Sequence, residues 1–325
     1  MWIVRKLLEK GYAVRGTVRS ADKAKYLEEY FKAYGHKFEF TIVEDITKYG
    51  AFDKAVKGIQ AIIHTASPFY LDAVSVNELL EPAVNGTVSI LKSALAYGQE
   101  IKRVVVISSA AAVSDFSVYK LLNEDDWNEP SVKEIKEKGA DAAGYVKYFA
   151  SKTAAERAAW QFYEDNKTEI SWDLSVLNPP YVFGPPVHEL KCSDALNTSL
   201  RLWYNVVVVG GQTEDFLKTG LAFIDVRDVA EAHVLALEKE AAGGERIIIS
   251  AGSFIWQQWV DAANSLSLPN PSHSKLPIGY PGLADTAKLP VEFDTRKAAR
   301  ILGLTYLNQE QVTRDSLADF VKRGW

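Results

Sequence analysis

The chain has almost no cysteine. Cys192 is the single thiol among 325 residues, and only five histidines accompany it. One cysteine cannot close an internal disulfide, and so few scattered thiol and imidazole groups form no recognisable set of metal ligands. We therefore expect neither a disulfide framework nor a bound metal ion.

Long apolar runs and basic clusters are lacking as well. No apolar stretch of the sequence approaches the roughly 18 residues that a membrane span requires. The N-terminus also lacks the ordered charged, apolar and small-residue regions of a secretory signal. The net charge is −5, and no basic tail or stripe of the kind that binds nucleic acid is present. These absences favour a cytoplasmic protein that binds neither membranes nor nucleic acid.

Short β-branched runs alternate with amphipathic stretches through the first two thirds of the chain. This alternation is typical of a parallel sheet with helices on both faces. Strands are expected at 12–18, 38–43, 59–64, 102–108, 172–177, 221–226 and 246–250. Helices are expected at 2–10, 21–34, 48–57, 75–97, 144–165 and 227–240. The sequence predicts an α/β fold with a Rossmann-type, doubly wound parallel sheet.

Two segments interrupt this rhythm. Residues 181–222 and 251–325 are less regular and richer in proline, tryptophan and tyrosine. We therefore expect a Rossmann domain built from residues 1–180 and 223–250. The two irregular segments are expected to form a smaller, discontinuous domain that binds the substrate.

The start of the chain departs from the usual order of a dinucleotide-binding fold. Such a fold opens with a strand, a glycine-rich turn and a helix whose N-terminus faces the pyrophosphate. Here residues 2–10 resemble the end of that first helix, and 12–18 resemble the second strand. We expect an N-terminally truncated sheet without its first strand, in which strands 12–18 and 59–64 face each other unpaired.

Tyr148 and Lys152 lie four residues apart in a stretch of helical composition, which puts both side chains on one helix face. Hydride reduction of a carbonyl leaves an alkoxide that needs a proton. A tyrosine with an ordinary pKa of about 10 is a poor donor at neutral pH, and a nearby ammonium lowers that pKa. The pair predicts a proton donor, although a tyrosine and a lysine on an amphipathic helix are also common without function.

Ser109 follows the apolar strand expected at 102–108. Ligands of open α/β sheets bind at the carboxyl ends of the strands, so a hydroxyl there can polarise a substrate carbonyl. The alternative is a serine that only satisfies the turn into the next helix. Its occurrence ahead of the Tyr148 helix favours the catalytic interpretation.

Arg19 and Lys23 follow the strand expected at 12–18. An acidic residue at this position binds the ribose 2′-hydroxyl of NAD, whereas an arginine accommodates the 2′-phosphate of NADP. The alternative is a pair of solvated surface cations. Within the predicted fold, the two residues indicate NADPH as the cofactor.

Seven ordered motifs carry a resemblance to the extended short-chain dehydrogenases. They are LLEKGYAVRGTVRSADK, HTASPF, EPAVNGTVSILKSAL, VVVISSAAAV, YFASKTAAE, LNPPYVFGP and FIDVRDVAEAH. Together they most resemble the fungal NADPH-dependent aldehyde and ketone reductases, of the methylglyoxal reductase type, and the plant dihydroflavonol reductases. The resemblance extends over nearly the whole chain from residue 3.

The resemblance implies a role for each matching residue. It makes Ser109, Tyr148 and Lys152 the catalytic residues and Arg19 with Lys23 the 2′-phosphate contacts. It also implies further cofactor contacts, together with pocket walls whose alternative is ordinary core packing. The cofactor contacts are Asp45 and Ile46 (adenine), Thr65 and Ala66 (ribose and pyrophosphate), Pro179 and Val182 (nicotinamide side) and Ser199 (phosphate), and the walls are Phe69 and Tyr181.

The function expected from these observations is NADPH-dependent reduction of an aldehyde or ketone. A nucleotide-sugar epimerase or dehydratase of the same superfamily is an alternative, but the only cations in 181–222 are Lys191, Arg201 and Lys218. A diphosphate site calls for more positive charge than that, so an apolar carbonyl substrate fits better. The sequence is also compatible with an NADPH-sensing protein or an inert truncated fragment. We expect a monomer or homodimer acting on a small molecule.

Overall fold

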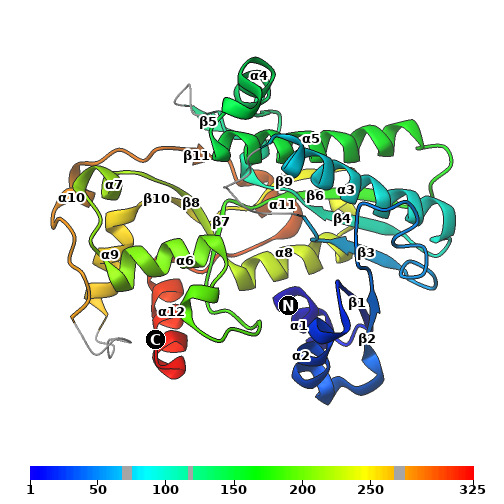
Figure 1. The fold of residues 1–325 in the computed structure, drawn as a ribbon, viewed down its shortest axis with the longest axis horizontal. Helices are drawn as coiled ribbons and strands as arrows, with labels where there is room; N and C mark the ends of the chain where they lie inside the picture. The colour runs from blue at the N-terminus through cyan, green and yellow to red at the C-terminus, as the bar shows by residue number, and fades with distance from the viewer. Residues whose placement is uncertain (68–74, 116–119, 267–274) are drawn as a thin grey trace.

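The computed structural model describes residues 1–67, 75–115, 120–266 and 275–325 (Figure 1). At its centre lies a four-stranded parallel sheet in the order β3-β4-β6-β9. Its strands are β3 (Ala61–His64), β4 (Arg103–Ile107), β6 (Asp173–Asn178) and β9 (Arg246–Ile248). The middle strands are buried along nearly their whole length, which explains their continuous apolar sequences.

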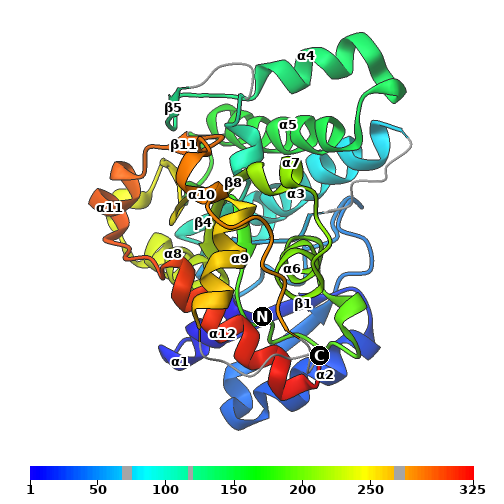
Figure 2. The same cartoon turned by 90° about the vertical axis from the view of Figure 1, so that its left-hand side faces the viewer.

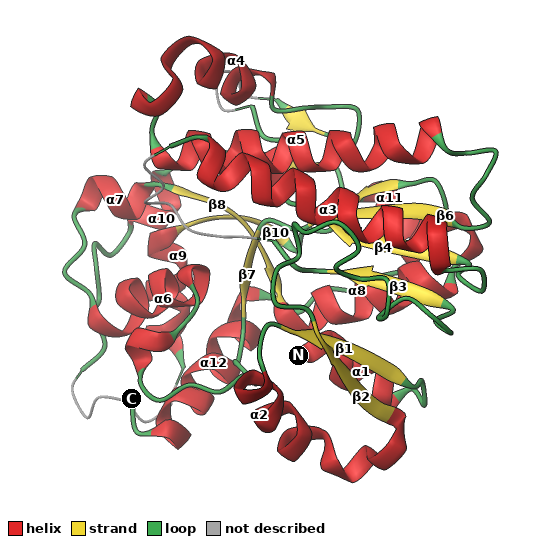
Figure 3. Cartoon of the chain, turned by 45° about the vertical axis from the view of Figure 1, so that its right-hand side comes forward, coloured by secondary structure: helices red, strands yellow, loops and turns green. Residues whose placement is uncertain are grey.

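Helices cover both faces of this sheet (Figure 3). On one face lie α3 (Asn77–Tyr97) and α5 (Gly144–Asp165); on the other lie α8 (Val226–Glu238) and α11 (Arg296–Leu302). Val104 and Val106 of β4 pack into the first core, whereas Val105 packs into the second. Because successive side chains of a strand point to opposite faces, one short strand serves both cores. The predicted doubly wound α/β fold is confirmed.

A second, two-stranded parallel sheet contains β1 (Val14–Val18) and β2 (Phe38–Ile42). Within the described ranges β1 pairs only with β2, and β3 pairs only with β4. Each strand therefore keeps one edge without a strand partner, as the sequence predicts. The helix α1 (Trp2–Glu9) precedes β1 and packs on α8, and α2 (Ala21–Phe31) follows β1.

The strand β8 (Gly220–Asp225) does not continue the central sheet, so that prediction is wrong. It joins β7 (Tyr181–Phe183) in parallel and β10 (Gly252–Ile255) in antiparallel pairing. A Cβ atom at Gly220 would lie 1.9 Å from the carbonyl oxygen of Phe254, so only glycine permits this close approach. The strand β8 is therefore the middle strand of a separate three-stranded sheet and not a strand of the central sheet.

A third core links the two irregular segments, 181–222 and 251–325. Trp203 of α6 (Thr198–Tyr204), Trp259 of α9 (Trp256–Ser265) and Phe320 of α12 (Gln309–Arg323) are among its largest buried side chains. Figure 2 shows α9 and α12 side by side. The smaller elements are β5 (Leu121–Leu122), α4 (Glu129–Lys138), α7 (Glu214–Lys218), α10 (Leu283–Thr286) and β11 (Glu292–Phe293).

The helix predicted at 48–57 is not formed. The chain makes consecutive turns there, bounded by Gly50 and Gly58 at φ of 73° and 68°. A residue at positive φ does not continue a right-handed helix, so Gly50 and Gly58 interrupt any helix that would run through them. Among the described helices, none is both long and apolar enough to cross a membrane. The described residues also contain no group of three or more His, Cys, Asp or Glu side chains that could hold a metal.

Candidate active site

Ser109, Tyr148 and Lys152 come together at the carboxyl end of β4. Ser109 caps the short 3₁₀ turn Ala110–Ala112, and its Oγ accepts a 3.1 Å hydrogen bond from the Ala111 backbone. The side chains of Ser109 and Tyr148 are hydrogen-bonded to each other. On α5, Lys152 follows Tyr148 by one helical turn, and its Nζ lies 5.9 Å from the centre of the tyrosine ring.

The two titratable groups have pKa values displaced in opposite directions. Burial raises the pKa of Tyr148 to about 12, and the Ser109 hydrogen bond partly opposes this rise. Burial lowers the pKa of Lys152 to about 8, against the attraction of the Glu156 carboxylate. Each shift follows from desolvation, which disfavours the charged form of either group.

From the spacing of the two residues we expected Lys152 to lower the pKa of Tyr148, and the structure shows no such effect. The Lys152 ammonium instead donates a 3.0 Å hydrogen bond to Ser67 Oγ, in the loop after β3. Its charge is therefore directed toward the end of β3. The phenol is held in its protonated form, the form that can give up a proton.

The cations expected to read the 2′-phosphate lie where the sequence places them. Arg19 directly follows β1, and Lys23 lies in the first turn of α2; both are exposed. Neither has a hydrogen-bond partner among the described residues. The pKa of Asp45 is lowered, mainly by hydrogen bonds that the Thr47 hydroxyl and backbone N–H donate to its carboxylate at 2.7 and 2.9 Å. The positive charge of Arg19 makes a smaller contribution in the same direction, so the two side chains lie near each other. The structure thus brings the ends of β1 and β2 together.

The other expected cofactor contacts lie in different surroundings. Thr65 and Ala66 follow β3 at its carboxyl end. The carbonyl oxygen of Pro179 accepts a 2.8 Å hydrogen bond from Ala110 beside Ser109. Val182 packs against the core beneath α8. These residues surround the carboxyl edge of the central sheet.

Two further expected contacts are less closely tied to the Tyr148 site. Ile46 packs against Gly86 of α3 at the margin of a core, which gives it a structural role. Ser199 is half-buried at the start of α6, and no hydrogen bond of its hydroxyl is seen within the described part of the chain. Phe69, expected as a pocket wall, lies outside the described residues.

Tyr181, the second expected wall, is close to Tyr148. Its phenol lies near enough to contribute to the raised pKa of Tyr148. The Tyr181 ring stacks on Phe183 at 5.7 Å and lies 6.2 Å from the Trp256 ring, which in turn stacks on Phe216. An aromatic surface therefore extends from Tyr148 into the three-stranded sheet and α9.

Several polar residues beside this site, most of them buried, were not anticipated from the sequence. Ser67 is the partner of Lys152, and His64 is a buried imidazole whose pKa burial lowers to about 4. Glu156, Asn178 and Arg246 form a buried cluster behind Ser109. The spacing of Glu156, one further turn along the face of Tyr148 and Lys152, is the signal that could have identified it.

These residues fit one part of NADPH better than another. Arg19 and Lys23 offer an exposed cationic pair suited to a 2′-phosphate, and Lys152 lies beside the carboxyl edge where a ribose would bind. For the pyrophosphate, the described residues include no strand or glycine-rich turn ahead of α1.

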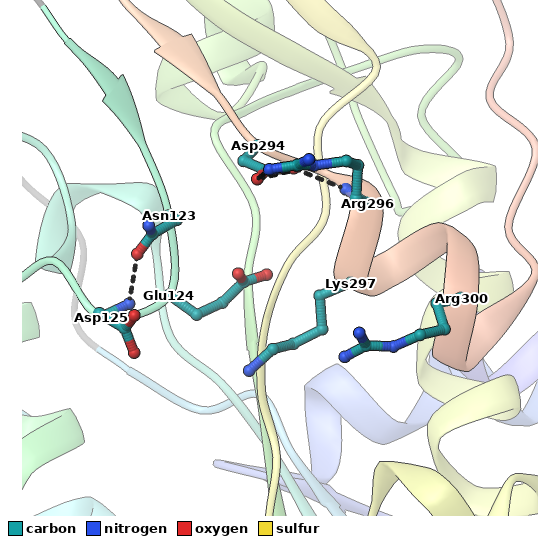
Figure 4. Close-up of a pocket in the computed structure, with 7 residues that line it drawn as sticks. All are labelled: Asn123, Glu124, Asp125, Asp294, Arg296, Lys297 and Arg300. Carbon is teal, nitrogen blue, oxygen red and sulfur yellow. Dashed lines mark hydrogen bonds and ion pairs between the residues drawn. The ribbon is translucent and has the colours of Figure 1, made fainter.

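Two surface cavities of the described residues lie away from this site. One, of about 350 Å³, lies beside the β5–β11 pair and contains none of the Ser109, Tyr148 and Lys152 side chains (Figure 4). Its cations are largely engaged, since Arg296 pairs with Asp294 and Lys297 with Glu245. A second, of about 340 Å³, lies between β5, β10 and β11. Neither has the groups that carbonyl reduction needs.

Comparison with known proteins places this fold and site in a family. Residues 1–252 match the NAD dependent epimerase/dehydratase family, the extended short-chain dehydrogenases, and the chain belongs to it.

Individual relatives narrow the comparison. The NADPH-dependent methylglyoxal reductase GRE2 of Saccharomyces cerevisiae is 35% identical over 333 residues, covering 98% of this chain and 94% of the relative. Ketoreductase azaE of Aspergillus niger is 32% identical over 333 residues, covering 99% and 94%. The crystal structure of Gre2 in complex with NADPH from Candida albicans superposes with a TM-score of 0.87 at 33% identity, covering 99% of this chain and 95% of that one. These relatives are reductases, although the family takes its name from epimerases and dehydratases.

Proposed function

We propose that this protein uses NADPH to reduce an aldehyde or ketone to an alcohol. The observation that carries the proposal is the Ser109–Tyr148 hydrogen bond at the end of β4, with Lys152 one helical turn away. This arrangement occurs in a chain that is 35% identical to a protein named as an NADPH-dependent methylglyoxal reductase.

The chemistry can be assigned to three side chains. NADPH, when bound, supplies a hydride to the carbonyl carbon. Ser109 donates a hydrogen bond to the carbonyl oxygen, and the Ala111 N–H holds its Oγ in place for that task. Tyr148 gives its proton to the developing alkoxide, which completes the alcohol. The phenolate left on Tyr148 takes a proton from solvent, and Lys152, whose ammonium donates to Ser67 after β3, is proposed to bind the cofactor ribose there.

Cofactor selection is proposed to rest on Arg19 and Lys23, which bind the 2′-phosphate that distinguishes NADPH from NADH. The rest of the cofactor is proposed to lie along the carboxyl edge of residues 1–180 and 223–250. The residues proposed to contact it are Asp45, Ile46, Thr65, Ala66, Pro179, Val182 and Ser199, together with Tyr148 and Lys152.

The substrate is proposed to be a small carbonyl compound with an apolar substituent. Tyr181 and the aromatic rings behind it supply an apolar surface beside the Tyr148 hydroxyl. Residues 181–222 and 251–325 are proposed to form the domain that contributes this surface. We further propose a cytoplasmic monomer or homodimer, which fractionation and light scattering would test.

The test is NADPH consumption by the purified chain with methylglyoxal and a series of larger aldehydes and ketones. We expect loss of NADPH absorbance that requires the carbonyl compound and is much slower with NADH. Consumption that is equally fast with both cofactors would contradict the cofactor assignment. No consumption with any of the carbonyl compounds would contradict the proposed reaction.

A further inference from the structure

A buried carboxylate lies directly behind the candidate site. Glu156 of α5 is 1% exposed, and it pairs with Arg246 of β9, which is 7% exposed. Burying two charges is costly unless their geometry and hydrogen bonds compensate. A protein that keeps such a pair next to reacting groups gives reason to ask what the pair holds in place.

The carboxylate connects three elements that meet at Ser109. Ser108 Oγ, at the end of β4, donates a 2.5 Å hydrogen bond to Glu156 Oε2. Asn178 Nδ2, at the end of β6, donates to the same oxygen at 2.7 Å and to the Ser109 carbonyl at 3.1 Å. Both acceptors face the amide nitrogen, which fixes the orientation of the Asn178 side chain. The backbone of Ser109 is thus held to α5, the helix that carries Tyr148.

Arg246 anchors this cluster from the far side. Its guanidinium donates to the carbonyl oxygens of Glu124 and Asp126, and it lies 3.8 Å from the centre of the Trp127 ring. The segment after β5 is therefore joined to the same ion pair. Glu156 Oε1 accepts from Arg246, and Oε2 accepts from Ser108 and Asn178, so the position of the carboxylate is closely defined, whereas Asn178 Oδ1 is buried without a partner in the described part of the chain.

The charge of Glu156 also acts on Lys152, one helical turn earlier on α5. The groups that face Lys152 are Tyr148 and Glu156 on its own helix, and Ser67 and His64 from the β3 side. His64 is uncharged near neutral pH, because burial lowers its pKa to about 4. Glu156 is consequently the negative charge that favours the ammonium form of Lys152.

We propose that Glu156 is a positioning residue, which fixes Ser109 against Tyr148 through Ser108 and Asn178 and sets a negative charge beside Lys152. The proposal rests on the proposed reductase function. It makes two separable claims. One concerns geometry, and Ser108→Ala tests it because that change removes a hydrogen bond and leaves every charge in place. The other concerns charge, and Glu156→Gln tests it because that change keeps the shape of the side chain.

The charge claim is tested without any assay of activity. In protein labelled with ¹³C at lysine Cε, the titration of the Lys152 resonance gives its midpoint, and Lys152→Arg assigns the signal. We expect Glu156→Gln to lower this midpoint by about one pH unit, the usual effect of losing one nearby opposite charge. Glu164→Gln is the matched control, because Glu164 lies on the same helix in an exposed pair with Lys167. An unchanged midpoint in Glu156→Gln overturns the charge claim.

The second measurement is the kcat of both variants at pH 6 and pH 8. A midpoint lowered from about 8 to about 7 reduces the charged fraction of Lys152 about fivefold at pH 8 and hardly at pH 6. The kcat of Glu156→Gln relative to wild type should therefore fall more at pH 8 than at pH 6. Ser108→Ala should lower kcat about tenfold at both pH values and leave the Lys152 midpoint unchanged. A wild-type kcat in Ser108→Ala overturns the geometric claim. Because this variant keeps Glu156, it tests the geometric claim even if Glu156→Gln does not fold.

The two levels of the proposal fail differently. A wild-type chain that oxidises no NADPH with any carbonyl compound contradicts the reductase function, and Glu156 then has no catalytic residues to position. An active wild type with unaltered kcat and Lys152 titration in both variants contradicts the role of Glu156 alone.

Discussion

Replacing Tyr148 with phenylalanine removes the hydroxyl that bonds to Ser109 and leaves the ring in place. General acid catalysis contributes about 10²–10⁴-fold, which corresponds to about 2.7–5.5 kcal/mol of activation free energy. Loss of one hydrogen bond costs only about 1 kcal/mol of folding stability, and Ser109 keeps its bond from Ala111. The variant should therefore stay folded while its kcat falls at least 100-fold.

The assay is steady-state oxidation of NADPH with methylglyoxal, alongside a thermal melt and NADPH titration. Tyr163→Phe is the matched control, because Tyr163 lies on the same helix and contacts Trp160 and Trp172, not the candidate site. It should retain wild-type activity. If Tyr148→Phe keeps more than about half of the wild-type kcat, Tyr148 is not the proton donor.

Further predictions concern the cofactor, pH and the sheet. Arg19→Ala should weaken NADPH binding by about 1.5–3 kcal/mol and NADH binding hardly at all, as measured by fluorescence titration; equal losses would contradict a 2′-phosphate contact. His233 is buried with its pKa lowered to about 4, so the folded state excludes a proton that the unfolded state binds below pH 6.5. The stability that neutral His233 supports is therefore lost as pH falls from 6.5 toward 4. In urea titrations, the free energy of unfolding of wild type minus that of His233→Gln should fall by about 2 kcal/mol between pH 7 and pH 5. A difference that stays constant over this pH range would contradict the lowered pKa of His233. Because β1 and β3 each have an edge without a strand partner in the described ranges, fusing a strand and a Gly-x-x-Gly-x-x-Gly turn ahead of α1 should raise both the melting temperature and NADPH affinity. That reasoning is contradicted if the chain without the added segment already binds NADPH with a micromolar dissociation constant and melts at the same temperature as the fusion.

The central sheet could be predicted because its strands carry their own signal. β4 and β6 are buried on both faces, so their sequences are apolar without interruption. The departure of β8 could not be predicted in the same way. Its sequence also looks like a buried strand, but it pairs with β7 and β10, and the close approach of Gly220 to Phe254 of β10 brings together residues 34 positions apart. Pairing of this kind is a tertiary effect that local patterns do not encode.

The candidate site likewise has features that the sequence predicts and features that only the folded chain shows. Tyr148 and Lys152 could be predicted to share a helix face, since their spacing alone determines it. The direction of the Lys152 ammonium toward Ser67 depends on the packing of β3 against α5, so the expected effect on the Tyr148 pKa was wrong. The Glu156–Arg246 pair joins residues 90 positions apart, and only the folded chain brings them together.

The most direct test of the proposed reaction follows the hydride itself. NADPH carrying deuterium at the nicotinamide carbon that donates hydride would be incubated with the purified chain and methylglyoxal, and the product analysed by mass spectrometry. The proposed reaction predicts an alcohol that carries one deuterium on the former carbonyl carbon, formed in step with NADPH oxidation and at least 100-fold more slowly in Tyr148→Phe. An unlabelled alcohol, or label transfer at more than about half of the wild-type rate in Tyr148→Phe, would contradict it.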